Sequence, residues 1–292
     1  MKARIFLCFF LLLSACSSTL QLIQGGKGDF DFHQPFISVP FEEIRGMIFV
    51  RVFLNQSLKE RVFLVDTAAS VSVLSQEVFE ELSLKPLKKV PVMGVQKKGE
   101  LTLTQLSSLQ LGGVVFKNLG FLVYPDLKKV SDLSEVPIHG ILGHNALRFF
   151  RVQFNFEAKT LTFYQTPLKN PQITGIPMGL RWDLGPFIDA YMFGKKVGAI
   201  IDTGSVRVVF PKKWALNFSA PLWAIEGSLS YGFLGFVEEE YFTPIRNLKI
   251  SHFTIPLVRA MALGKISQAH QESLILGTDV LKGFLFTLDY LS

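Results

Sequence analysis

The chain has 292 residues, of which 49% are hydrophobic and 18% are charged, and its formal net charge is +6. So much apolar surface excludes an intrinsically disordered protein. The longest unbroken apolar run, Ile5–Leu13, falls short of the ~20 residues of a membrane-spanning helix, which excludes a protein with several spans. The positive charges form no block, and we therefore expect no nucleic-acid partner.

The N-terminus has the order of an export signal. Lys2 and Arg4 precede the apolar run, and small residues follow it. The segment Leu13-Ser14-Ala15-Cys16 resembles the lipobox of bacterial lipoproteins, in which the signal is cleaved before the cysteine and the cysteine is acylated. An ordinary cleaved signal with an incidental cysteine is the alternative interpretation.

The lipobox resemblance implies a lipoprotein signal peptide over residues 1–15, lipidation at Cys16 and a tether over residues 16–35. Attachment through more than one acyl group is stable, so we expect a membrane partner through this N-terminal anchor. Ser17 after the cysteine implies the outer membrane of a bacterial cell envelope, with the protein facing the periplasm. Cys8, the second cysteine, lies in the leader, so the mature chain has no thiol for a disulfide, a metal or a nucleophile.

The rest of the chain repeats once. An apolar run leads into Asp-Thr within Arg61–Leu74 and again within Val197–Val209. Each of these segments is followed, at a similar distance, by Ile-Leu-Gly, within Gly140–Leu147 and within Leu274–Leu281. A hairpin pattern precedes each Asp, and Leu109–Gly113 matches Leu248–His252 between the two markers, so four matches in the same order predict a duplicated unit.

The two units are predicted to be domains of the same kind, residues 36–168 and 172–292, with a Pro-rich joint between them. Most of their segments are short, rich in β-branched and aromatic residues and bounded by Gly, Pro or Asn, which is typical of strands. Helices are expected at Gln76–Leu82 and in the turns that Asn145 and Asp279 would cap. The predicted strands, including one hairpin before each Asp-Thr, are Met47–Leu54, Leu101–Gln110, Val114–Tyr124, Val152–Phe156, Leu161–Tyr164 and Gly185–Phe193.

Each Asp-Thr sequence places a carboxylate directly after a buried strand. The strand fixes the position of the aspartate, and the following threonine can tie the loop to backbone across an interface. Packing of the two units around a pseudo-twofold axis would bring Asp66 and Asp202 together. Two adjacent carboxylates do not both ionise easily, so one can accept a proton from water while the other donates one.

Together, the apolar-apolar-Asp-Thr-Gly-Ser segment and the Ile-Leu-Gly-x-Asn/Asp-x-Leu segments resemble the signature of the aspartic proteases, and the short lobes resemble the retropepsin-like unit. The resemblance implies an all-β, bilobal pepsin/retropepsin-like fold and an endopeptidase that cleaves a peptide or protein substrate with an activated water. It also implies that one chain supplies both aspartates, so that a monomer suffices, and it involves no metal and no cofactor. The implied catalytic residues are Asp66 and Asp202, with motif support from Thr67, Ala68, Thr203, Gly204 and Ser205.

Two further features depend on this resemblance. The segments Met93–Gly99 and Ser230–Gly235 stand where hairpin flaps would close over substrate. The first loop reads Asp-Thr-Ala, and Ala68 is unfavourable if the position needs a left-handed backbone or close contact with substrate. A non-catalytic peptide-binding lipoprotein is therefore the alternative function, and a purely mechanical lipoprotein is a third interpretation that leaves the paired loops unexplained.

Other chemistry is weakly supported. The five histidines have no metal-ligand spacing and are expected in loops or on the surface. Ser205 lacks a Gly-x-Ser-x-Gly context, which disfavours a serine hydrolase. Arg207 is expected to face solvent rather than to shift the pKa of a neighbouring group.

Overall fold

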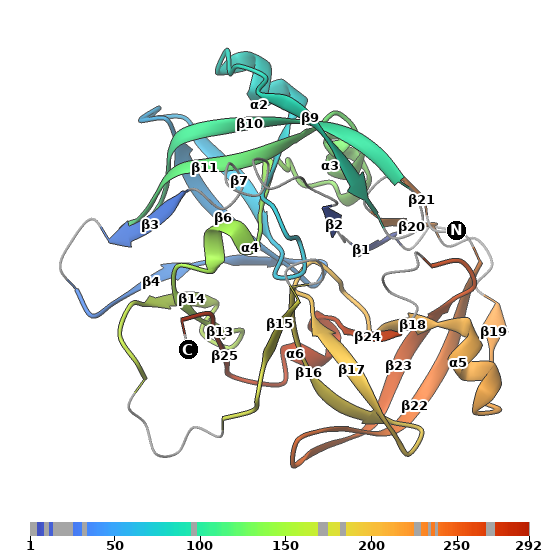
Figure 1. The fold of residues 1–292 in the computed structure, drawn as a ribbon. Coiled ribbons are helices and arrows are strands. Elements are labelled where there is room, and N and C mark those ends of the chain that lie inside the picture. The colour runs from blue at the N-terminus through green and yellow to red at the C-terminus, as the bar shows by residue number, and fades with distance from the viewer. Residues whose placement is uncertain are drawn as a thin grey trace.

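The computed structural model shows two β-rich lobes and a smaller sheet beside the first lobe (Figure 1). The all-β, bilobal fold expected from the sequence is confirmed. Within the described part, no helix is long and apolar enough to cross a membrane. The structure describes residues 5–8, 12–13, 26–30, 34–94, 98–168, 175–181, 185–224, 229–232, 235–236, 239–266 and 272–291.

The first lobe is a ten-stranded sheet that closes on itself where β10 pairs with β6. Its central strands follow the order β10-β11-β8-β12-β7-β6, with β5 at one end and β9 and β2 at the other, while β3 pairs with β11. These strands are β2 (Leu12–Leu13), β3 (Lys27–Phe30), β5 (Glu42–Ile44), β6 (Met47–Leu54), β7 (Glu60–Val65), β8 (Val73–Ser75), β9 (Lys88–Met93), β10 (Lys98–Leu111), β11 (Val114–Tyr124) and β12 (Gly140–Leu142).

The second lobe repeats this topology. Its eight-stranded sheet contains the order β22-β23-β18-β24-β17-β16 and closes where β16 pairs with β22. In both lobes the strand before Asp-Thr pairs in parallel with the Ile-Leu-Gly strand, so the predicted duplication is confirmed strand by strand. The strands are β15 (Gly179–Arg181), β16 (Gly185–Met192), β17 (Lys195–Ile201), β18 (Val209–Pro211), β19 (Trp223–Ala224), β22 (Glu240–Ile250), β23 (Phe253–Leu263) and β24 (Ser273–Leu276).

A four-stranded sheet returns the C-terminus to the first lobe. Its order is β25-β13-β14-β4, and all three pairings are antiparallel. The last strand of the chain therefore lies beside a hairpin that follows directly on the first lobe (Figure 1). The strands are β4 (Phe36–Pro40), β13 (Arg151–Asn155), β14 (Thr160–Tyr164) and β25 (Phe286–Asp289).

Two short strands form a separate hairpin, β20 (Leu229–Gly232) with β21 (Gly235–Phe236), and β1 (Ile5–Cys8) pairs in parallel with β20. This hairpin coincides with the second expected flap, whose tip residues 233–234 lie outside the described residues. The first expected flap is the β9–β10 hairpin, and its residues 95–97 also lie outside them. Cys16 and most of the predicted tether are likewise outside, whereas residues 27–30 of that tether form β3.

The helices are short. The helix expected at Gln76–Leu82 is confirmed as α2 (Gln76–Glu81), whose first turn is capped by the Ser75 hydroxyl. The turns expected to be capped by Asn145 and Asp279 are helical but begin earlier, because glycines occupy the cap positions and free both side chains for other contacts. The other helices are α3 (Leu127–Ser134), α4 (His144–Leu147), α5 (Lys212–Asn217) and α6 (Thr278–Leu281).

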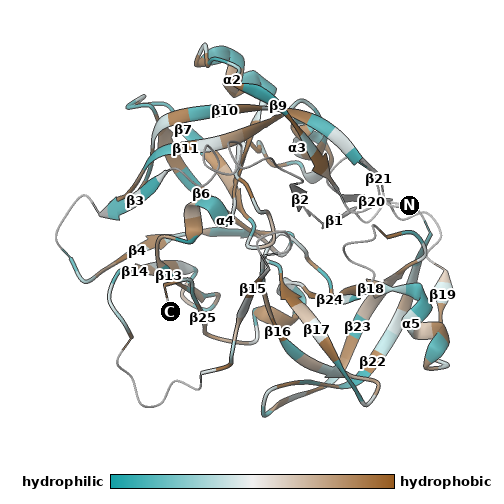
Figure 2. Cartoon of the chain, in the orientation of Figure 1, coloured by the Kyte–Doolittle hydropathy of each residue, from teal (hydrophilic) through white to brown (hydrophobic). Residues whose placement is uncertain are grey.

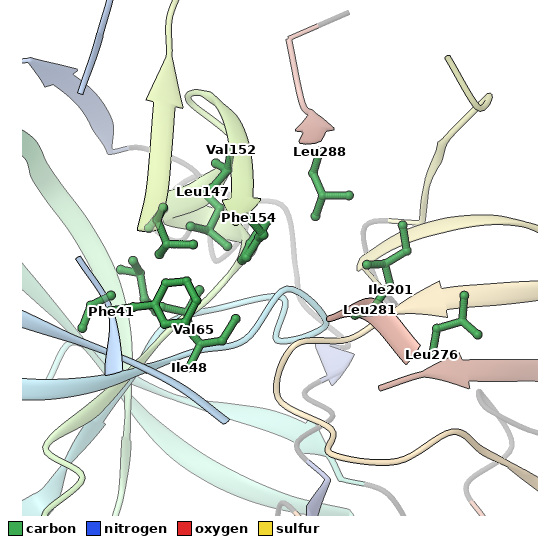
Figure 3. Packing of buried hydrophobic residues seen from close by; sticks show 14 of the residues in the cluster. Phe41, Ile48, Val65, Leu147, Val152, Phe154, Ile201, Leu276, Leu281 and Leu288 are labelled. Carbon is green, nitrogen blue, oxygen red and sulfur yellow. The ribbon is translucent and has the colours of Figure 1, made fainter. Parts of the chain in front are cut away.

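One apolar core runs through both lobes and the small sheet. Hydrophobic and hydrophilic residues alternate along many strands, as expected for sheets with one buried face (Figure 2). Full burial of each large apolar side chain stabilises the fold by about 1.5–3 kcal/mol. The cluster includes Val65 and Leu147 of lobe one, Phe154 and Leu288 of the small sheet, and Ile201, Leu276 and Leu281 of lobe two (Figure 3).

Candidate active site

Asp66 lies at the end of β7, in the interior of the molecule. Its N–H donates to the Leu142 carbonyl on the parallel strand β12, at 3.0 Å. Its Oδ1 accepts from the N–H groups of Ala68 at 2.9 Å and Ala69 at 3.0 Å. The loop therefore turns back on the carboxylate, and the side chain is fully buried.

Asp202 is held in the same way in lobe two. Its N–H donates to the Leu276 carbonyl at 3.1 Å, and its Oδ1 accepts from Gly204 at 2.8 Å and Ser205 at 3.1 Å. This carboxyl is also fully buried. The two predicted catalytic residues thus have equivalent environments within one chain.

The two threonines tie the loops to each other. The Thr67 hydroxyl donates to the Ile201 carbonyl at 2.6 Å, and the Thr203 hydroxyl donates to the Val65 carbonyl at 2.8 Å. Each hydroxyl also accepts from the backbone N–H of the other threonine at 3.1 Å. Four buried hydrogen bonds therefore cross between the lobes, as expected for threonines that support the aspartates.

Gly204 packs directly against the Asp66 carboxyl, and the two carboxyl side chains interact with each other. Its N–H binds Asp202, while a Cβ built on it would lie 2.5 Å from Cγ and Oδ2 of Asp66. Burial raises the pKa of Asp66 to about 7. Burial, and next to it the charge of Asp66, raise the pKa of Asp202 well above its usual value. The pair therefore retains a proton at pH values where an exposed aspartate would have lost it.

The second oxygens of the two carboxyls remain available for chemistry. Neither Asp66 Oδ2 nor Asp202 Oδ2 accepts a hydrogen bond from the described residues, although both atoms are buried. Each Oδ1 is used twice by the loop backbone. The arrangement can hold one shared proton and present the remaining oxygens to a polar molecule between the lobes.

Ala68 fits the first loop without distortion. Ala68 is not among the described residues that have a positive φ. Its N–H donates to Asp66 Oδ1 at 2.9 Å, and the Gly204 N–H donates to Asp202 Oδ1 at 2.8 Å. Its methyl group is buried against an apolar cluster of lobe two that includes Ile200. The left-handed backbone that would disfavour alanine is therefore not adopted here.

Asn145 braces the first loop from behind. Its Oδ1 accepts from both N–H and Oγ of Ser72, at 2.8 Å each, and its Nδ2 donates to the Gly120 carbonyl at 2.9 Å. A sequence signal for this role existed, because Asn145 and Asp279 occupy equivalent places in the repeat.

Asp279 occupies the position in lobe two that Asn145 has in lobe one, with a carboxyl in place of the amide. Burial raises its pKa to about 6, and the charge of Arg207 and hydrogen bonds from the Val208 and Val280 N–H groups oppose this shift. The prediction that Arg207 faces solvent was wrong: it is half-buried and acts on the Asp279 carboxyl. Ser205 has a structural role, since its hydroxyl donates to the Arg207 carbonyl at 2.9 Å.

His144 and Tyr290 were missed as neighbours of the site. His144 was expected in a loop or on the surface, yet its Nδ1 is buried and its ring packs against Tyr290. The His144 position follows the glycine of Ile-Leu-Gly, and Tyr290 after β25 corresponds in the repeat to Phe156 after β13. Among the described residues, no group of three or more His, Cys, Asp or Glu side chains is placed to hold a metal.

Comparisons with known proteins agree with this geometry. Residues 50–146 match a family model described as aspartyl protease. Solved structures with a similar fold include basic 7S globulin from soybean, at 11% sequence identity and a TM-score of 0.50, covering 87% of this chain and 92% of that one. A comparison with curated proteins finds no match. The chain therefore has the pepsin-like aspartic protease fold, and its first lobe carries the sequence pattern of the aspartyl protease family.

Proposed function

We propose that the protein is an aspartic endopeptidase whose catalytic dyad is Asp66 and Asp202. The observation that carries this proposal is the pair of buried carboxyls that interact with each other, each held by two loop N–H groups and both with a raised pKa. Such a pair shares a proton, which is the state that acid-base catalysis by two carboxyls requires.

In this mechanism the ionised carboxyl accepts a proton from a water molecule, and the protonated one donates to the oxygen of the scissile carbonyl. The water attacks the carbonyl carbon, and a proton then passes to the leaving amine as the C–N bond breaks. No covalent intermediate is formed with the enzyme. The crossing hydrogen bonds of Thr67 and Thr203 keep the two carboxyls in register, so little reorganisation is needed during the reaction.

Cleavage of an unstructured protein from pH 3 to 8 tests this function. Asp66→Asn and Asp202→Asn should each remove turnover, because the dyad can no longer supply both proton transfers. Asp189→Asn is the matched control, since this aspartate is exposed on β16 and pairs with Lys196. Activity that survives in both dyad variants would exclude the mechanism.

The alternative function is peptide binding without turnover. It is motivated by Ala68, which stands in the first loop at the position that Gly204 has in the second. The hydrogen bond from its N–H to Asp66 and its unstrained backbone favour retained catalysis. Ala68→Gly distinguishes the endopeptidase from the binding protein. If the parent is inactive and the variant gains much hydrolysis, the parent is a peptide-binding protein without turnover, whereas an active parent excludes this alternative.

The lipid anchor and the location are also proposals. The export signal and lipobox resemblance support acylation at Cys16 and attachment to the bacterial envelope, on the periplasmic face of the outer membrane. Metabolic labelling with a radioactive fatty acid should label the wild-type protein and not Cys16→Ala. Equal labelling of both would exclude this attachment point. The duplicated dyad supports a monomer, which sedimentation of the detergent-free mature chain can test.

A further inference from the structure

Two short strands near the N-terminus come from one apolar run of the sequence and pair with hairpins of different lobes. β1 pairs in parallel with β20, beginning with Ile5 opposite Leu229. β2 pairs in antiparallel fashion with β9, with Leu12 opposite Met93. The β9–β10 hairpin belongs to lobe one, and the β20–β21 hairpin precedes β22 of lobe two. The N-terminal run therefore contacts both hairpins that are expected to act as flaps.

These pairings occupy one edge of each hairpin. Among the described strands, β20 lies between β1 and β21, and β9 lies between β2 and β10. Without the N-terminal run, each hairpin would present a row of unpaired N–H and C=O groups along this edge. Such an edge binds an extended peptide by adding it as a further strand. The N-terminal run thus takes the place that an extended substrate would take on the two hairpins.

The β2 pairing lies beside the Asp-Thr loops. Met93, the partner of Leu12 in the ladder, packs against an apolar cluster that contains Ala68 and Ile200. Ala68 follows Asp66 by two residues and donates to its carboxyl, and Ile200 lies on β17, the strand that leads to Asp202. β1 and β2 lie between the two lobes (Figure 1). A strand on this edge of β9 therefore lies next to the apolar cluster that borders both aspartates.

The composition of the run suits this place. Ile5–Leu13 contains no charged residue and is the longest unbroken apolar run of the chain. Transfer of apolar surface out of water is worth about 25 cal/mol for each Å². In export this property directs the run to a membrane. In a chain outside the membrane, the two hairpin edges and the cluster around Met93 offer a binding site of matching chemistry.

The connection to lobe one makes this binding effective. Residues 14–26 join the run to β3, which pairs with β11 of lobe one. A binding segment attached through a short flexible linker has an effective concentration in the millimolar range. A free peptide at micromolar concentration competes poorly with such a segment, even where the affinity of the segment is modest.

We propose that the N-terminal run, through β1 and β2, occludes the substrate-binding edges of both hairpins in the unprocessed chain, so that the precursor inhibits itself. This inference rests on the proposed function, because it assigns a form of regulation to the endopeptidase site. Hydrolysis of the bond before Cys16 by a separate signal peptidase would sever the run from residues 16–292. The effective concentration is then lost, and both edges become available to substrate.

The test compares the full chain with a variant that carries proline at four positions of the run. Cell-free synthesis without membranes keeps the leader attached. In a strand with one partner, alternate N–H groups face that partner, so two adjacent prolines in each strand remove whichever N–H does so. With a short fluorogenic peptide as substrate, KM should fall about tenfold while kcat stays within about twofold, because an attached competitor raises only KM. The substitutions are Phe6→Pro, Leu7→Pro, Leu12→Pro and Leu13→Pro.

The matched control carries four prolines outside the bounds of β1 and β2, and it should keep the parental KM. Equal Tm values in the three chains show that both lobes are intact. A parental KM in the first variant would overturn the proposal, as would an equal fall of KM in the control. The control substitutions are Thr19→Pro, Leu20→Pro, Ile23→Pro and Gln24→Pro.

A second readout does not depend on turnover and so separates this inference from the proposed function. The probe is a fluorescein-labelled peptide of residues 5–13 flanked by lysines, and its binding is followed by fluorescence anisotropy in chains that also carry Asp66→Asn. The four-proline variant of the run should bind the probe at least tenfold more tightly than the chain with the parental run, whose own segment holds the edges. If this difference appears while no chain cleaves peptides, self-inhibition of the site stands and the endopeptidase function fails. Equal affinities, or binding to neither chain, overturn the proposal.

Discussion

The contact between Gly204 and the Asp66 carboxyl makes Gly204→Ala an informative perturbation. The added methyl would lie 2.5 Å from both Cγ and Oδ2 of Asp66, which is closer than side-chain carbons pack. The carboxyl cannot move away freely, because its Oδ1 is held by the N–H groups of Ala68 and Ala69. The conflict must therefore be relieved by displacing one of the two Asp-Thr loops.

The expected cost is that of overpacking a well-filled interior, about 1–3 kcal/mol. For a chain of this size, that corresponds to a fall in Tm of roughly 5 °C. Turnover should fall by more than the stability loss explains, since a displaced carboxyl no longer faces its partner at the required geometry.

The assay is thermal unfolding by calorimetry, with peptide cleavage measured well below the transition. Gly198→Ala is the control, because a Cβ at that position would meet only Phe187 Cδ2 at 3.9 Å, an ordinary contact. This control should change Tm by no more than about 2 °C. If Gly204→Ala keeps the parental Tm and turnover, the carboxyl does not lie against this glycine and the reasoning is refuted.

Three further predictions concern protons and hydrogen bonds. Burial raises the pKa of Asp66 to about 7 and that of Asp202 above its usual range, so the contribution of these two carboxyls to stability is complete below about pH 4 and is lost as pH rises through 7. Tm should therefore fall more steeply over this pH range in the parent than in Asp66→Asn. Equal slopes in the two proteins would contradict the raised pKa. Thr203→Val removes the hydroxyl that donates to the Val65 carbonyl at 2.8 Å and accepts from the Thr67 N–H at 3.1 Å, so urea unfolding should show a loss of about 1–3 kcal/mol, and a loss below about 0.5 kcal/mol would mean that the crossing bonds contribute little. Asp279→Asn supplies the amide that lobe one has at Asn145, and because burial raises the pKa of Asp279 to about 6, the variant should raise Tm at pH 7.5 but hardly at pH 3.5, below the pKa of an unfolded aspartate; an equal effect at both pH values would exclude this carboxyl as the titrating group.

The sequence was sufficient for the features that repeat. The hairpins before Asp66 and Asp202 and the threonine ties follow from patterns that occur twice. Short strands with turn signals also identified β11 (Val114–Tyr124) within its observed bounds. Such local and duplicated signals survive in a single sequence because each copy supports the assignment of the other.

Contacts between segments far apart in the chain could not be found this way. Pairing of β25 with β13 joins segments far apart in the chain, and no turn signal or periodicity specifies it. For the same reason the contact between His144 and Tyr290 was missed. The helix that Asn145 was expected to cap begins earlier, at His144, because Gly143 takes the cap position and the Asn145 amide binds Ser72 instead. In each case a tertiary contact decided the outcome over local propensity.

The sharing of one catalytic proton between two buried aspartates is tested most directly by the pH dependence of peptide cleavage in the parent, Asp66→Asn and Asp202→Asn. The parent should give a bell-shaped profile of kcat/KM bounded by two apparent pKa values of the pair, and each asparagine variant should be inactive at every pH. Cleavage that persists in either variant with an unchanged profile would contradict the shared proton and the dyad built on it.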